Sequence, residues 1–204
     1  MQWLEAAGHE RIVLIDNDST WEPMRVYLLR SPHKVHLESQ NWLSRAPWDM
    51  GIVPDEWWAY TDSDLVPLPE CPYDLVDRCI ELLHRYPGVP KAGPGLYLGD
   101  VPEDLYCLRY EQRLIANAIK PEPGVFYTVT DTTFCVYRPG AAFQYSSFRL
   151  GFPYQARHSS WYVQEPDDEI RHYLSRASRA ELGSSWAKEL DNRGRIEGFE
   201  RGSG

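Results

Sequence analysis

The stretch that organises this chain reads Trp57-Trp58-Ala59-Tyr60-Thr61-Asp62-Ser63-Asp64, an aromatic run that ends in two carboxylates one residue apart. The apolar and aromatic residues predict a short, largely buried strand. The aspartates then lie near the carboxyl end of a strand, where ligands bind in open α/β sheets. Because side chains two apart on an extended segment point the same way, Asp62 and Asp64 could hold one Mg²⁺ or Mn²⁺ ion together with a diphosphate. The alternative is a turn in which these carboxylates bind only local backbone.

Composition narrows the class of protein. A chain of 204 residues with a hydrophobic share of 43% fits one domain, which we place at residues 1–189, before a charged, glycine-rich tail at 190–204 that we expect to be flexible. The net charge of −9 argues against a nucleic-acid binder that depends on bulk charge, but it leaves room for a local arginine patch. No run approaches the length of a membrane span, and the four widely spaced cysteines fit reduced thiols, so we expect a cytoplasmic protein.

A second acidic turn follows the first apolar run of the chain. Residues 12–15 predict a strand, and Asp16-Asn17-Asp18-Ser19-Thr20 comes directly after it. One interpretation is the nucleotide-contacting turn of a sugar transferase. Another is the nucleophile loop of the haloacid-dehalogenase-like phosphatases, which the segment partly resembles, with Asp16 as nucleophile and Asp18 as acid/base. A helix N-cap beside a solvated carboxylate would explain the same residues without a site.

Helical and strand patterns fill most of the remaining chain. Apolar spacing predicts helices over residues 1–7, 22–29, 72–86, 103–119 and 167–177, and strands over residues 34–37, 91–98, 125–129 and 130–138. The segment Lys91-Ala92-Gly93-Pro94-Gly95 is too rich in glycine for an ordinary strand. It indicates either a backbone that lies very close to another group or an edge strand that Pro94 interrupts.

Two later stretches contain further candidate site residues. Asp131 lies in an apolar, β-rich stretch, where a carboxylate is costly unless it is paired or hydrogen-bonded. It is therefore either a site residue or an acceptor of backbone amides. His158 lies between an arginine and several aromatic residues within positions 153–162, which leaves it either a structural residue or a metal ligand.

Taken in order, these motifs resemble a GT-A glycosyltransferase of the family-two-like group. The resemblance covers about residues 3–173 and rests on these segments: Asp16-Asn17-Asp18-Ser19-Thr20, Asp62-Ser63-Asp64, Lys91-Ala92-Gly93, Asp131-Thr132-Thr133-Phe134 with Tyr137-Arg138, and Pro153-Tyr154 with Arg157-His158 and Trp161-Tyr162. It implies an α/β fold with a Rossmann-like, mixed but mainly parallel sheet flanked by helices. The strand that usually opens this fold is not evident, so either this strand is missing or another segment pairs in its place.

The resemblance also implies a reaction, in which a metal-dependent enzyme moves a sugar from a nucleoside-diphosphate sugar, such as a UDP-sugar, to an acceptor hydroxyl. In that family the Asp-x-Asp pair binds the metal and the donor diphosphate, which maps onto Asp62 and Asp64. His158 is then the candidate third ligand to Mn²⁺ or Mg²⁺.

The remaining roles follow from the same resemblance. Asp16, Asn17 and Lys91 would contact the nucleotide-sugar donor together with Asp62. Asp131 ranks first as the catalytic base, with Glu165, Asp167 and Asp168 as the alternatives. The acceptor stays open between a glycan, a small molecule and a modified base of viral DNA, and so does assembly into a homo-oligomer. The phosphatase and a non-catalytic module that binds nucleotide sugars or carbohydrate are the alternatives.

Overall fold

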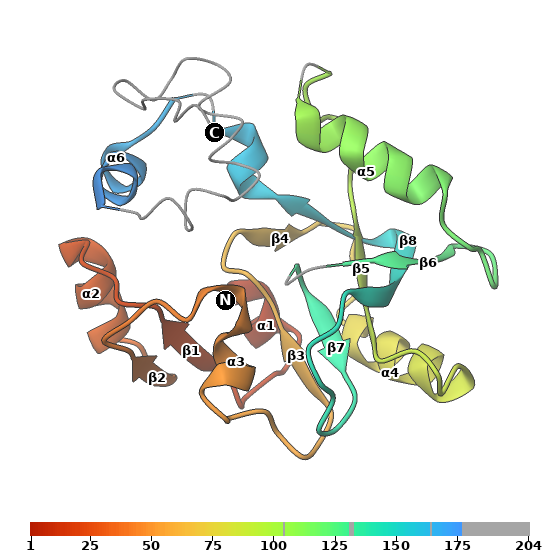
Figure 1. Cartoon of the computed structure of the whole chain (residues 1–204), viewed down its shortest axis with the longest axis horizontal. Helices are drawn as coiled ribbons and strands as arrows, with labels where there is room; N and C mark the ends of the chain where they lie inside the picture. The colour runs from red at the N-terminus through yellow and green to blue at the C-terminus, as the bar shows by residue number, and fades with distance from the viewer. Residues whose placement is uncertain (104, 131–132, 164, 177–204) are drawn as a thin grey trace, which may run out of the picture.

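The computed structural model describes residues 1–103, 105–130, 133–163 and 165–176, which form a small β-α-β unit and a larger sheet (Figure 1). The expected tail at 190–204 lies outside the described residues. Within them, no helix is both long and apolar enough to cross a lipid bilayer.

The small unit follows α1 (Gln2–Ala6) and consists of β1 (Val13–Asp16), α2 (Glu22–Leu29) and β2 (Lys34–Leu37). β1 and β2 pair in parallel, and α2 supplies the crossover connection that a parallel pair needs. Pro23 lies in the first turn of α2, where the backbone amide that proline lacks has no partner within the helix. The predicted strand, helix and strand are confirmed here to within one residue.

The larger sheet contains β3 (Trp58–Tyr60), β4 (Leu65–Pro67), β5 (Lys91–Leu96), β6 (Val125–Val129), β7 (Cys135–Tyr137) and β8 (Ser146–His158). Its strand order is β3-β7-β5-β8-β4, and β6 pairs with β8 outside this path. Among the described strands of this sheet, only β5 and β8 pair in parallel, and the other four pairings are antiparallel.

The α/β class is confirmed, but the expected mainly parallel sheet is not. Parallel neighbours need a crossover connection, usually a helix. The links from β3 to β4 and from β7 to β8 contain no helix, and the chain reverses its direction across each of them. The 13-residue strand β8 pairs antiparallel with both β4 and β6. The sheet is therefore mixed, with β3, β5 and β8 running in one direction.

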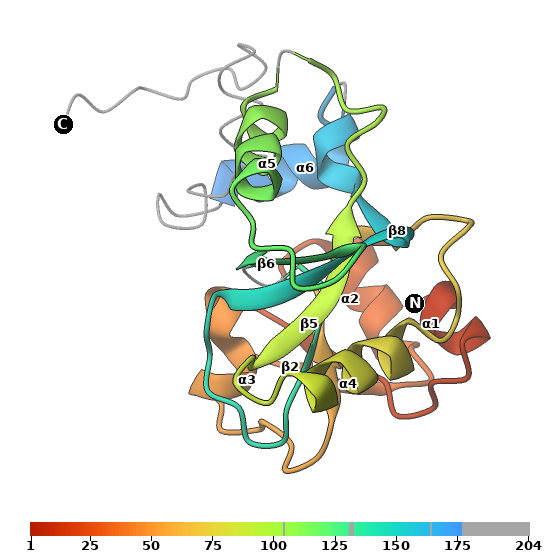
Figure 2. The same cartoon turned by 90° about the vertical axis from the view of Figure 1, so that its right-hand side faces the viewer.

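Helices cover this sheet and enclose two hydrophobic clusters. The remaining elements are η1 (Leu43–Arg45), α3 (Ala46–Asp49), α4 (Leu75–Arg85), α5 (Tyr106–Ala116), η2 (Ser159–Tyr162) and α6 (Asp168–Arg176). α4 packs along β5 and β7 through a buried stripe of leucines and Cys79 (Figure 2). A second cluster joins α5 to Trp161 of η2 through Leu105 and Leu108.

The glycines of β5 allow neighbouring strands to approach closely. A Cβ atom at Gly93 would lie 2.0 Å from the backbone oxygen of Phe134, and one at Gly95 would lie 2.5 Å from that of Leu150. All residues of β5 are buried and the strand has partners on both sides, so it is not an edge strand. The close approach inferred from the sequence is confirmed, and the nearby group is the backbone of the next strand.

Gly93→Ala is expected to lower the free energy of unfolding by about 3 kcal/mol, because backbone on the adjacent strand must move to admit the methyl group. Gly88→Ala is the matched control, since nothing lies within 4 Å of the Cβ position there. Its effect should stay within about 0.5 kcal/mol. Denaturant unfolding measures both, and similar values for the two variants would contradict the close packing at Gly93.

Candidate metal centre

The direction of three strands brings the acidic turn close to His158. Residues 61–64 leave the carboxyl end of β3 and lead into β4, which pairs antiparallel with β8 so that Leu65 lies opposite His158. His158 is the last residue of β8, which runs in the same direction as β3. The turn and His158 therefore meet at one edge of the sheet, the edge where ligands bind in open α/β folds.

Asp62, Asp64 and His158 form a compact group of potential metal ligands. One ligand atom from each residue lies within 4.8 Å of those of the other two. Oδ2 of Asp64 is 3.1 Å from Nδ1 of His158, and these two side chains are 28% and 11% exposed. The Asp64 carboxylate is thus engaged by a side chain distant in the sequence, which the local-turn interpretation does not explain.

Main-chain contacts hold the two segments of this centre together. The carbonyl oxygen of Asp64 accepts hydrogen bonds from both the amide (2.7 Å) and the hydroxyl (2.9 Å) of Ser159. Oγ of Ser160 lies 2.7 Å from Nδ1 of His158. The start of η2 therefore fixes the position of Asp64 and of the imidazole at the same time.

Trp161 fixes the plane of the His158 ring. The two rings are stacked, with centroids 5.0 Å apart and planes 1° from parallel. Trp161 is only 5% exposed and belongs to the hydrophobic cluster beneath α5. Because the indole is held by this core, the imidazole has little freedom to tilt, and a metal ligand that is already oriented loses less entropy on binding.

The surroundings of the turn keep the Asp64 carboxylate ionised. Burial alone would raise the pKa of Asp64, but the hydrogen bond and charge of His158, with help from Ser160, lower it below its ordinary value. Burial and the nearby negative charge of Asp62 raise the pKa of Tyr60 to about 12. The centre therefore presents the ionised carboxylate of Asp64 beside a neutral phenol.

The donor atoms of this centre fit a divalent metal ion. Two carboxylates supply hard oxygen ligands, which suit both Mn²⁺ and Mg²⁺. The imidazole of His158 is a ligand that transition metals accept more readily than Mg²⁺ does. Of the two ions expected from the sequence, Mn²⁺ fits this mixed set better.

The other acidic turn makes local contacts. Oδ2 of Asp16 accepts the amide of Ser19 at 3.1 Å, as in a turn or helix cap. Asn17 reaches the loop before η1, where its side chain accepts the amide of Trp42 and donates to the carbonyl of Leu43. Leu43 has a φ of 55°, a conformation that non-glycine residues rarely adopt. Asn17 thus supports an unusual loop conformation beside the end of β1.

Lys91 lies inside the sheet and binds the end of β6. It is fully buried, and its ammonium group donates to the carbonyl of Thr130 at 2.6 Å and lies 3.3 Å from the hydroxyl of Tyr137. Asp131, predicted to be the catalytic base, lies outside the described residues.

A buried polar network at Thr130 is the feature that the sequence patterns missed. The hydroxyl of Thr130 accepts hydrogen bonds from Ser147 at 2.6 Å and from Arg149 at 2.8 Å. Arg149 also forms a buried ion pair with Glu111 of α5. The sequence does indicate this network, because two charged residues occupy positions expected to face the core. Glu111 lies among the core-facing residues of an amphipathic helix, and Arg149 lies in an otherwise apolar strand segment.

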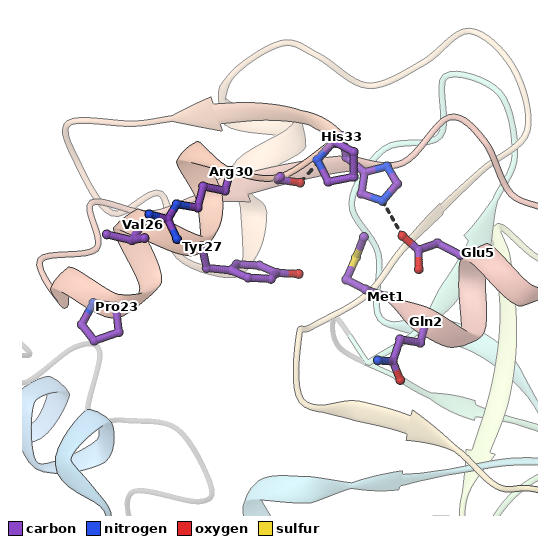
Figure 3. A pocket seen from close by; sticks show the side chains of 10 residues that line it. Met1, Gln2, Glu5, Pro23, Val26, Tyr27, Arg30 and His33 are labelled. Carbon is purple, nitrogen blue, oxygen red and sulfur yellow. Dashed lines mark hydrogen bonds and ion pairs between the residues drawn. The ribbon is translucent and has the colours of Figure 1, made fainter.

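A hollow of about 470 Å³ lies apart from these residues, between α1 and α2 (Figure 3). Tyr27 and Met1 line it together with Glu5 and His33, whose side chains are joined by a hydrogen bond of 2.8 Å. None of the site residues predicted from the sequence is among the residues lining it.

Trp161→Leu is expected to weaken Mn²⁺ binding by about tenfold, because the imidazole loses the surface that orients it. Trp161→Phe, which keeps a flat ring, should stay within about threefold of the parent protein. Isothermal titration calorimetry with Mn²⁺ measures both. Leu105→Ala in the same hydrophobic cluster separates this effect from lost packing, since it should destabilise the fold by about 2–5 kcal/mol without changing Mn²⁺ affinity. Equal Mn²⁺ affinities in the Trp161→Leu variant and the parent would contradict a positioning role.

Comparison of the chain with protein-family models, with curated proteins and with solved structures found no match.

Proposed function

We propose that this protein is a metal-dependent glycosyltransferase of the GT-A type, which transfers a sugar from a nucleoside-diphosphate sugar to an acceptor hydroxyl. The observation that carries the proposal is the grouping of Asp62, Asp64 and His158 within 4.8 Å at the carboxyl edge of β3 and β8. The sheet pairings support an α/β class only, so the GT-A topology is part of the proposal.

The reaction needs its negative charges neutralised as the leaving nucleoside diphosphate separates from the sugar. A bound Mn²⁺ ion would supply this stabilisation, which is worth several kcal/mol in general. Asp62, Asp64 and His158 would hold that ion. A chain of net charge −9 repels an anionic donor unless such a bridge is present.

The other residues have supporting roles in this proposal. Asp16 and Asn17 would contact the nucleotide from the end of β1, in line with the resemblance of this turn to the nucleotide-contacting turn of family-two-like enzymes. Lys91 is fully buried and binds Thr130 and Tyr137, so we assign it no contact with the donor, in place of the role expected from the sequence. Asp131 would deprotonate the acceptor hydroxyl. The acceptor would be a glycan, a small molecule or a modified base of viral DNA.

The contacts of Asp16 give the phosphatase alternative less support. Its carboxylate accepts the amide of Ser19, and Lys91, the one plausible lysine partner in that mechanism, binds the carbonyl of Thr130. A phosphatase would need both groups free to act on a phosphate.

Thermal unfolding with nucleoside diphosphates tests the proposal. A ligand that binds only the native state at 100 times its Kd stabilises it by about 2.7 kcal/mol, so a diphosphate that matches the donor should raise Tm by about 5 °C or more in the presence of Mn²⁺. Asp62→Asn should abolish this Mn²⁺-dependent rise, whereas Asp16→Asn should reduce it and leave its metal dependence. Loss of the metal dependence in Asp16→Asn alone would overturn the assignment.

Hydrolysis of the donor separates an enzyme from a binding module. Glycosyltransferases slowly transfer the sugar to water, so a screen of common sugar nucleotides with Mn²⁺ should reveal one that is hydrolysed. Binding of a sugar nucleotide without hydrolysis of any would favour the non-catalytic module.

A further inference from the structure

The exposed side of α5 combines tyrosines with arginines. Tyr106, Arg109, Tyr110 and Arg113 are spaced by three and four residues, so they share one face of the helix, which we call the α5 outer face. Tyr106 and Tyr110 are 57% and 46% exposed. Their rings lie 6.3 Å apart and within 21° of parallel. Both views of the fold show α5 at the periphery (Figures 1 and 2).

The α5 outer face is positively charged within an acidic protein. Glu111 is the acidic residue of this helix, and it is buried in an ion pair with Arg149. Across the part of the chain that the structure describes, no ion pair involves Arg109 or Arg113, whereas arginines such as Arg157 are paired with carboxylates. The two guanidinium groups are exposed and, among the described residues, form no ion pair that would neutralise them, in a chain of net charge −9.

The packing of α5 shows that these residues do not serve the core. Cys107, Leu108 and Glu111 point inward and are buried, which leaves the arginines and tyrosines on the outside. Two neighbouring, nearly parallel phenol rings present flat surfaces on which planar groups can stack. Guanidinium groups one helical turn apart suit anions spaced along a flexible chain.

We propose that the α5 outer face binds single-stranded nucleic acid, with Tyr106 and Tyr110 stacking on bases and Arg109 and Arg113 contacting phosphates. Stacking on aromatic side chains inside a basic strip is the usual way in which proteins hold single strands without reading their sequence. A lipid surface fits less well, because this face has no leucine, phenylalanine or tryptophan to insert among acyl chains. This inference is independent of the metal centre and of the proposed sugar transfer.

Binding can be measured by fluorescence anisotropy with a labelled short oligothymidylate at low salt. Charge-driven, non-specific contacts with nucleic acid give Kd values of about 10⁻⁴ to 10⁻⁶ M at physiological salt, and binding should be tighter at low salt. Two phosphates neutralised on a single strand predict that log K falls against log salt concentration with a slope of about −1.4. No binding at about 50 mM salt would overturn the proposal.

Two double variants separate the contribution of base stacking to binding from the contribution of charge. Tyr106→Ala with Tyr110→Ala should weaken binding by at least about tenfold and leave the salt slope unchanged, because base stacking does not release counterions. Arg109→Gln with Arg113→Gln should bring the salt slope close to zero. All four positions are exposed and the new residues favour helix, so circular dichroism should show an intact fold.

The matched control is Arg25→Gln with Arg30→Gln, which removes the same charge from exposed positions around α2. Its affinity should stay within about threefold of the parent protein. Equal losses in this control and in the α5 arginine variant would show that bulk charge alone attracts the strand, and would overturn the site.

Competing ligands test the class of partner. Dextran sulfate at matched charge should bind at least about tenfold more weakly than the oligonucleotide, because it has no planar rings to stack. Equal affinity for dextran sulfate, or tighter binding to phosphatidylserine vesicles than to the oligonucleotide, would replace nucleic acid with an anionic glycan or a membrane.

Discussion

Asp64→Asn should lower Mn²⁺-dependent hydrolysis of the donor by about a hundredfold or more. The substitution removes a charge from the candidate metal centre and from the 3.1 Å contact between Asp64 and His158. Stabilisation of a leaving diphosphate by a metal is worth several kcal/mol, and each 1.36 kcal/mol changes the rate about tenfold. Steady-state rates and Mn²⁺ affinity, measured on the same preparations, give the size of both losses.

Asp100→Asn is the control for this variant. Asp100 is a carboxylate close in space to the same strand, but it is exposed and bound to Arg157 and Tyr162. Its loss should change neither Mn²⁺ affinity nor hydrolysis by more than about threefold, since exposed ion pairs contribute about 0–1 kcal/mol. If Asp64→Asn behaves like Asp100→Asn, Asp64 does not bind the metal.

The metal-free stability of the Asp64→Asn variant separates folding from metal binding. The pKa of Asp64 is lowered in the folded protein, so its ionised form stabilises the fold above the pKa of the unfolded chain. This contribution is lost as the pH falls through the lowered folded value. The parent should therefore be more stable than the variant near neutral pH, and the difference should vanish in acid.

Glu111→Leu is expected to cost about 3–5 kcal/mol of unfolding free energy, because it leaves the guanidinium of Arg149 buried without its carboxylate. For a chain of this size the loss corresponds to a fall in Tm of about 6–20 °C. Chemical and thermal unfolding at neutral pH measure the effect.

The double variant Glu111→Leu with Arg149→Met completes this comparison. Replacing both members of a buried ion pair with apolar residues is often nearly neutral. Here the double variant should recover a large part of the loss, but not all of it, because Thr130 also loses the hydrogen bond from Arg149. A single variant as stable as the parent would mean that the ion pair is not the buried interaction described above.

Local patterns predicted the elements well and the sheet less well. The apolar periodicity behind α2, α4 and β6 is local, and the structure places these elements within three residues of their expected ends. Strand direction depends on which strands become neighbours, and that is decided by contacts far apart in the sequence. β8 was missed as one strand because Gly151 and Pro153 interrupt its pattern.

In the candidate site, too, the features set by neighbouring residues could be predicted from the sequence, and those set by distant contacts could not. Asp62 and Asp64 are two residues apart on an extended segment, so the sequence alone indicated that their side chains lie together, and the aromatic neighbours of His158 marked it as a candidate ligand. The stacking of Trp161 and the network at Thr130 could not be predicted, because they depend on how α5, β6 and β8 come together.

β1 and β2 form a sheet separate from the larger one, and this separation bears on local unfolding of the chain. A two-stranded sheet is marginally stable by itself. Within the described residues, polar contacts tie this unit to the following loop through Asn17, to α6 through Thr20 and His172, and to α1 through His33 and Glu5. Such a unit can unfold locally at a lower free energy than the rest of the chain. A nucleotide held by Asp16 at one end and by the candidate metal centre at the other would bridge the two-stranded unit and the larger sheet, so that substrate binding would also stabilise β1 and β2 against local unfolding.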